Sequence, residues 1–131
     1  MTNKVHISQM DDRVMAYETG TTLLAAGGIF TGEVMQVAGY GHITGWIFSD
    51  VSSATSGVII EQALTVSDLL VATPNTTNVT SSTLAYTAGE YVSNAYSVQV
   101  VAPFARILYV NGAAAQTAFR LYFEARVFRG L

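Results

Sequence analysis

The stretch "FARILYVNGAAAQTAFRLYFEARVF", residues 104–128, carries the clearest periodic pattern in the chain. In its second half every other side chain is apolar. Phe119, Leu121, Phe123, Ala125 and Val127 fall on one face, and Arg120, Tyr122, Glu124 and Arg126 on the other. A period of two is typical of a β-strand with one face packed against a core. The strongest local signal therefore predicts β-structure, not helix.

The pair Asn111-Gly112 divides this stretch and predicts a hairpin, because both residues tolerate the positive φ of a tight turn. Two registers are open across it. One places Arg106 beside Leu121 on the dry face, where an unpaired charge is costly. The other is favoured on electrostatic grounds: it sets Ile107 and Tyr109 with Phe119 and Leu121, and leaves Arg106 near Arg120, Tyr122 and Glu124.

Elsewhere in the chain, short β-like runs rich in Val, Ile, Thr, Tyr and Phe alternate with Gly, Ser, Asn or Pro clusters. The expected strands lie within 29–37, 41–49, 57–64, 69–73, 83–87, 95–101, 104–110 and 117–128, with a polar loop at 74–82. No window has a helical stripe. We therefore predict an all-β, antiparallel β-sandwich over residues 29–131, either jelly-roll or Ig-like, preceded by an extended N-terminal arm, residues 1–28, that holds at most one short strand.

The composition is unusually poor in charge. Charged residues make up 11% of the 131 residues, against roughly 25% in typical soluble domains, and the net charge is −3. No apolar run approaches the length that crosses a bilayer, and the N-terminus lacks a signal-peptide core, so we expect no membrane partner. So little charge indicates apolar surface that other subunits or partners cover.

No set of residues supports catalysis, so we expect no enzyme, no cofactor and no metal site. The chain has no cysteine, and neither His6 nor His42 has a second ligand at metal spacing. Glu61 and Glu124 have no spacing that would make them an acid–base pair. With six basic residues in an acidic chain, nucleic-acid binding is not expected either.

The outer face of the expected hairpin mixes aromatic and aliphatic side chains with arginines, which is the composition of protein–protein contacts. We interpret it as a subunit interface made of Phe104, Arg106, Leu108, Arg120, Tyr122 and Glu124. The alternative is a free surface on which arginine stems lie over exposed aromatic rings.

Two segments, "YGHITGWIFSDVSSATSGVIIEQ" and "VVAPFARILYVNGAAAQTAFRLYF", resemble a family of small β-sandwich structural proteins of tailed bacteriophages. The resemblance covers roughly residues 39–123. The matching positions are Trp46 to Phe48, Ser49-Asp50, Gly57, Glu61, Ala102-Pro103-Phe104, Arg106, Tyr109, Asn111-Gly112, Gln116-Thr117 and Phe119-Arg120. The chain departs from the family at "ALTVSDLLV", after the strand that carries Glu61.

This resemblance implies a virion protein, made in the host cytoplasm and placed on the capsid surface as a head decoration or head fibre. It also implies a homo-oligomer, with a trimer expected, that contacts the major capsid protein and carries no catalytic residue. The rival hypothesis is a tail-tip or fibre module that binds a host receptor or glycan through end loops 51–56, 74–82 and 111–116, with Trp46 or tyrosines as stacking platforms.

Overall fold

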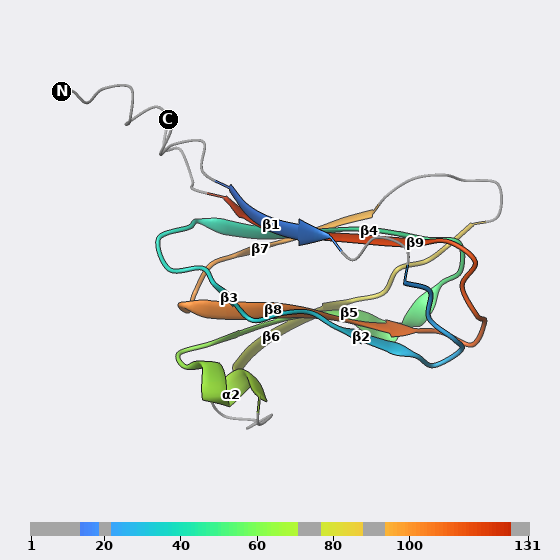
Figure 1. Ribbon diagram of the computed structural model, residues 1–131, viewed down its shortest axis with the longest axis horizontal. Coiled ribbons are helices and arrows are strands. Elements are labelled where there is room, and N and C mark those ends of the chain that lie inside the picture. The colour runs from blue at the N-terminus through green and yellow to red at the C-terminus, as the bar shows by residue number, and fades with distance from the viewer. Residues whose placement is uncertain (1–13, 19–21, 71–76, 88–93, 127–131) are drawn as a thin grey trace.

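The computed structural model describes residues 14–18, 22–70, 77–87 and 94–126, and Figure 1 shows their ribbon as two stacked β-layers. Sheet A has the strand order β1-β9-β4-β7 and sheet B the order β2-β8-β5-β6, with β3 also pairing with β8. The strands are β1 (Val14–Glu18), β2 (Ile29–Thr31), β3 (Met35–Gln36), β4 (His42–Ser49), β5 (Ser53–Ala63), β6 (Thr77–Ser82), β7 (Asn94–Gln99), β8 (Phe104–Asn111) and β9 (Phe119–Arg126). The predicted all-β sandwich is confirmed.

All the strand pairings of the described residues are antiparallel. The alternation in residues 119–125 has the expected result, because Phe119, Leu121, Phe123 and Ala125 are all buried. The core between the layers also takes Ile43 and Ile47 from β4, Val58 and Ile60 from β5, and Ala105, Ile107 and Tyr109 from β8. Val127, expected on the same face, lies outside the described residues.

The hairpin predicted at Asn111-Gly112 is wrong. Strand β8 pairs with β5, β2 and β3, whereas β9 pairs with β4 and β1, so the chain crosses from one sheet to the other between them. Ile107 and Tyr109 do meet Phe119 and Leu121 in one core, but across the layers and not side by side in one sheet. The alternation of side chains predicts which face of a strand is buried, but not which strand pairs with it.

Three further expectations differ from the structure. Residues 66–70 form a single helical turn, α2 (Val66–Leu70), where a strand was predicted from residue 69, and Asp68 N donates to Thr65 Oγ1 (3.2 Å) at its start. The predicted polar loop 74–82 holds strand β6, and residues 83–87, a predicted strand, carry no strand pairing. No helix in the described part of the chain is long and apolar enough to span a membrane.

Part of the segment predicted as an N-terminal arm belongs to the sandwich. Strand β1 pairs with β9 at one edge of sheet A, with Glu18 opposite Tyr122. Leu24 is held at both its backbone groups by Gln116: Leu24 N donates to Gln116 Oε1 (2.9 Å), and Gln116 N donates to Leu24 O (3.0 Å). Residues 1–13 lie outside the described residues, so an arm there stays a prediction.

Candidate interaction surface

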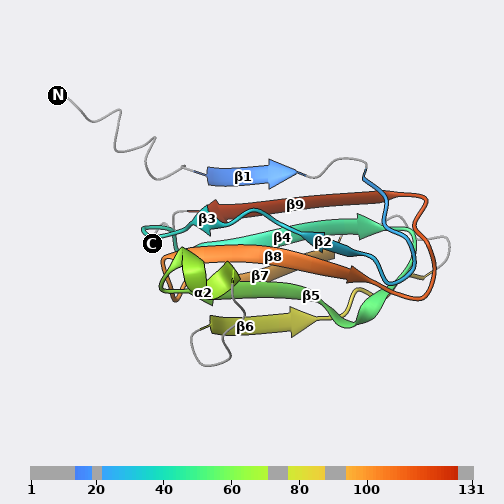
Figure 2. The same cartoon turned by 60° about the horizontal axis from the view of Figure 1, so that its bottom comes forward.

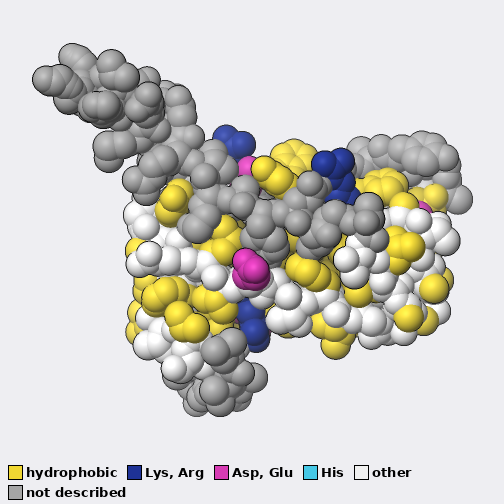
Figure 3. All heavy atoms as spheres, in the orientation of Figure 1, with side chains coloured by type: hydrophobic (Ala, Val, Ile, Leu, Met, Phe, Trp, Pro, Cys, Tyr) yellow, Lys and Arg dark blue, Asp and Glu magenta, His cyan; other side chains and the backbone are white. Residues whose placement is uncertain are grey.

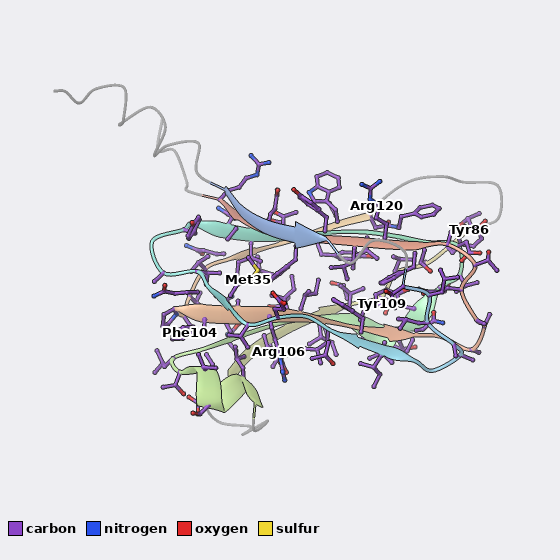
Figure 4. The ribbon with its side chains drawn as sticks, in the orientation of Figure 1. Met35, Tyr86, Phe104, Arg106, Tyr109 and Arg120 are labelled. Atoms are coloured by element: carbon purple, nitrogen blue, oxygen red, sulfur yellow. The ribbon has the colours of Figure 1, made fainter. Side chains whose placement is uncertain are left out.

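The six predicted interface residues do not share one face. Phe104, Arg106 and Leu108 lie on the outer face of sheet B, whereas Arg120, Tyr122 and Glu124 lie on the outer face of sheet A. In Figure 4, Arg106 and Arg120 point away from opposite sides of the sandwich, while Tyr109 lies between the layers. A single subunit contact cannot contain all six residues, because the thickness of the core separates them.

Arg106 is engaged within its own sheet. Its Nε donates to Glu61 Oε1 across the β5–β8 pair at 2.8 Å, and only 13% of the Arg106 side chain and 18% of the Glu61 side chain are exposed. Glu61 belongs to the strand flagged by the phage-protein resemblance, and this ion pair gives it a structural role. A charge already paired and largely covered contributes little to recognition of a partner.

Glu124 is also covered, with 7% of its side chain exposed, although the alternation places it on the outer face of sheet A. Its neighbour on the same strand, Arg126, closes over it: Arg126 Nε donates to Glu124 Oε1 at 2.8 Å. This hydrogen bond and the charge of Glu124 raise the pKa of Arg126. Strand β9 is central in sheet A, flanked by β1 and β4, so its outward side chains have neighbours on both sides.

The outer face of sheet A carries an aromatic–arginine surface, which we define by Trp46, Phe48, Arg120 and Tyr122. Trp46 on β4 lies directly opposite Tyr122 on β9, and Phe48 lies opposite Arg120. Trp46 is 45% exposed and Tyr122 39% exposed. Figure 3 shows hydrophobic and basic side chains side by side along the top of the molecule, over the layer formed by β4 and β9.

The sequence pattern identified Arg120 and Tyr122 but assigned Trp46 only to a possible glycan platform. The β4–β9 register brings Trp46 and Tyr122 together on the outer face of sheet A. Large aromatic side chains next to an arginine are the residue types that dominate binding energy in protein contacts. The arrangement suits a flat protein partner better than a small ligand.

The loops of the rival hypothesis do not converge on one site. Segments 51–56 and 111–116 meet at one end of the sandwich, where Gly112 N donates to Ser52 O (3.2 Å). Thr77–Ser82 instead forms a strand at the side of sheet B. Asn111 Nδ2 is itself occupied by the backbone carbonyls of Ala25 (3.0 Å) and Ala114 (2.9 Å).

Asp50 organises the same end of the sandwich. Its carboxylate accepts from the backbone N–H groups of Thr117 (3.0 Å) and Ala118 (3.1 Å) and from the Thr117 hydroxyl. Burial pushes the pKa of Asp50 upward, but these hydrogen bonds outweigh burial and hold the pKa below its ordinary value. Asp50 thus ties the end of β4 to the segment that leads into β9.

The described residues hold no group of three His, Asp or Glu side chains placed to bind a metal ion. A cavity of about 50 Å³ opens at the side of the sandwich, lined by Val58, Ile60, Thr80, Ser82, Tyr96, Ser97 and Val98. It is far smaller than the roughly 300 Å³ at which ligand pockets begin. A cavity of this size is too small to enclose a ligand of ordinary size.

Residues 6–126 match the family described as the N-terminal domain of the uncharacterised protein YqxG. The chain belongs to this family. A search among curated protein sequences finds no match.

Among solved structures, this YqxG-type domain is similar to the PBSX exported protein XepA, with a TM-score of 0.66 and 19% sequence identity over 89% of the chain. The domain spans 38% of the XepA chain. A structure described in work on disulfide-linked pili of Bacillus endospore appendages gives a TM-score of 0.37 at 14% identity, covering 89% of this chain and 91% of that one. The likeness to XepA supports the two-layer fold.

Proposed function

We propose that this protein is a non-enzymatic structural component encoded by a phage, and that it acts as a homo-oligomer on the virion head, decorating and stabilising the capsid. The observation that carries the proposal is the Trp46–Tyr122 pair, exposed on the outer face of sheet A beside Arg120. A free monomer gains nothing from two large aromatic rings held in water, whereas a subunit contact buries both.

Two further observations support a phage-encoded structural role. The fold is similar to that of XepA, an exported protein of phage PBSX. Charged residues are only 11% of the chain, which suits a surface shared with neighbouring subunits. The resemblance to phage head proteins supplies the finer parts of the proposal: three copies in the oligomer and the major capsid protein as the second partner.

In this proposal the aromatic–arginine surface meets the next subunit. The outer face of sheet B, where the Glu61–Arg106 ion pair is already satisfied, is left to face solvent or the shell. A standard interface of about 800 Å² on each side, repeated around a shell, supplies enough apolar burial to stabilise it.

The proposal is tested by native mass measurement of the full chain, together with gold-labelled antibody on intact virions. A native mass of three copies, or of a multiple of three, with label spread over heads is the expected result. A monomeric mass at micromolar concentration would overturn the homo-oligomer. Label on tails alone would replace head decoration by the receptor-binding alternative, and protein found only outside the particles would overturn the virion assignment.

A further inference from the structure

The edge strands on the two sides of the sandwich differ in charge and in continuity. On one side, the β2–β3 edge is broken between Thr31 and Met35, with the charged Glu33 exposed in the gap. Charges and interruptions of this kind are the usual protection against edge-to-edge pairing. That side is blocked by both devices.

The other side carries neither device. Edge strands β6 and β7 contain no charged residue and no proline in their twelve positions, "TNVTSS" and "NAYSVQ". The second view of the ribbon, in Figure 2, shows β6 as the outermost strand of its layer on this side. Unbroken, uncharged edges are templates on which another strand can pair.

The hydrogen-bond pattern shows which groups β7 offers. Val100 N donates to Gly41 O (2.9 Å), directly beyond the partners His42 and Gln99. Because residues in an antiparallel ladder alternate in direction, Tyr96 and Val98 turn their backbone groups to β4. Ala95, Ser97 and Gln99 therefore turn theirs to the open edge, and Gln62 Nε2 already donates to the carbonyl of Gln99 (3.0 Å). Among the described residues, the available part of the edge centres on Ser97.

The side chains of β7 favour this edge over β6. Tyr96 and Val98 point inward, half-buried, and line the 50 Å³ cavity with Val58 and Ile60. The residues of β6 that line the same opening, Thr80 and Ser82, are polar. An added strand with apolar inward side chains would cover this opening and continue the core of the sandwich.

We propose that β7 pairs antiparallel with β7 of a second copy, about a two-fold axis at Ser97. The strand is self-complementary in this register. Ser97 lies opposite Ser97 of the second copy, Ala95 opposite its Gln99, and on the inner side Tyr96 opposite its Val98. Each copy contributes an aromatic and a β-branched side chain to the same inner row, a favourable cross-strand pair.

This contact goes beyond the proposed function and does not depend on the aromatic–arginine surface. A two-fold contact is isologous and closes with two copies, so it cannot build a three-membered ring by itself. It joins copies that belong to different rings. A protein with both contacts can link neighbouring oligomers across a shell.

The absence of cysteine from the chain permits a direct test. In Ser97→Cys the two thiols of a paired dimer face each other, so a short thiol-to-thiol cross-linker such as dibromobimane bridges them. We expect most of this variant to run as a covalent dimer on a denaturing gel, also in a Tyr122→Asp background. Ala95→Cys is the matched control and stays monomeric, whereas Ala95→Cys with Gln99→Cys is bridged.

Failure of Ser97→Cys to cross-link, or equal cross-linking of Ala95→Cys alone, would overturn this pairing. Bridging to a different virion protein would show another occupant of the edge and would overturn it too. As a second measurement, Ser97→Lys places two like charges opposite each other and halves the native mass. Ser81→Lys on β6 leaves that mass unchanged. The reverse result would assign the contact to β6.

Discussion

Trp46 and Tyr122 are cross-strand neighbours on the outer face of sheet A, joined by the register of β4 and β9 and both more than one-third exposed. Neither ring contributes to the core, which is filled from the opposite faces of the same strands. A substitution on this surface therefore separates assembly from folding.

Tyr122→Asp is expected to reduce the native mass to that of smaller species, because a carboxylate on the aromatic–arginine surface must be desolvated in the contact. The separated chain should still unfold in one cooperative transition, since Tyr122 lies on the outer face of sheet A and outside the core cluster. Size-exclusion chromatography with light scattering, together with a thermal melt, measures both quantities.

Two controls define the result for the aromatic–arginine surface. Thr31→Asp introduces the same charge at an exposed position of sheet B and should leave the oligomer intact. Arg120→Asp should reproduce the effect of Tyr122→Asp. If either Arg120→Asp or Tyr122→Asp elutes as the native oligomer, this surface is not the subunit contact.

The Glu61–Arg106 ion pair predicts a different outcome on the opposite face. Arg106→Ala leaves a largely covered carboxylate unpaired, which should lower the free energy of unfolding by roughly 2–3 kcal/mol. The double variant Glu61→Leu with Arg106→Met removes both charges and should recover most of this loss. Urea unfolding measures the stabilities, and native mass should not change in either variant. Equal destabilisation by the single and the double variant would contradict the ion pair's role.

The sequence predicted the faces of β8 and β9 but not their separation into two sheets. Alternation assigns Ile107 and Phe119 to a core whichever strands pair, and Asn111-Gly112 suits a tight turn as well as a crossing loop. The crossing is instead held by Asp50 and Gln116, whose partners in residues 117–118 and Leu24 are distant in sequence. Such contacts leave no local signal.

The burial of Glu124 and two short elements, α2 and β6, could not be predicted from the sequence. The alternation of strand β9 places Glu124 on the outer face, where an exposed side chain is expected. It is nevertheless buried, because β9 is central in its sheet and Arg126 pairs with it. Helix α2 has five residues, too few for a helical period to show. Strand β6 consists mostly of Thr, Ser and Asn, which are typical of loops, so the sequence predicts a loop there. As an exposed edge strand, β6 does not need alternating apolar residues.

Asp50 makes the stability of the fold depend on acid pH. Its pKa is lowered in the folded state, so its contribution is present above the ordinary value of 3.8 and is lost as the pH falls through the lowered value. Asp50→Asn should cost roughly 1–3 kcal/mol at neutral pH. The variant should then lose less stability than the parent as the pH falls from 3.8 through the lowered value. Urea midpoints across this range measure the difference, with Glu33→Gln as a control. Parallel pH profiles for parent and Asp50→Asn would refute a stabilising role of the Asp50 carboxylate.

Gly45 faces Ile107 across the core between the two sheets. It lies on the inner face of β4, and a Cβ built on it would stand 2.8 Å from Ile107 Cδ1 of the facing sheet. Gly45→Ala should therefore overpack the core and lower the free energy of unfolding by about 1–2 kcal/mol. Ile107→Val removes the Cδ1 atom and by itself should cost about 1 kcal/mol through the space it leaves.

In the double variant the alanine methyl group occupies the space that the isoleucine gave up. Its loss should thus be smaller than the sum of the two single losses by more than about 0.5 kcal/mol, measured by urea unfolding of all four proteins in a double-mutant cycle. Val58→Ala in place of Ile107→Val provides a control cavity from another core position. Strict additivity of Gly45→Ala with Ile107→Val would mean that the sheets shift apart to accept the methyl group, and that Gly45 does not fix their spacing.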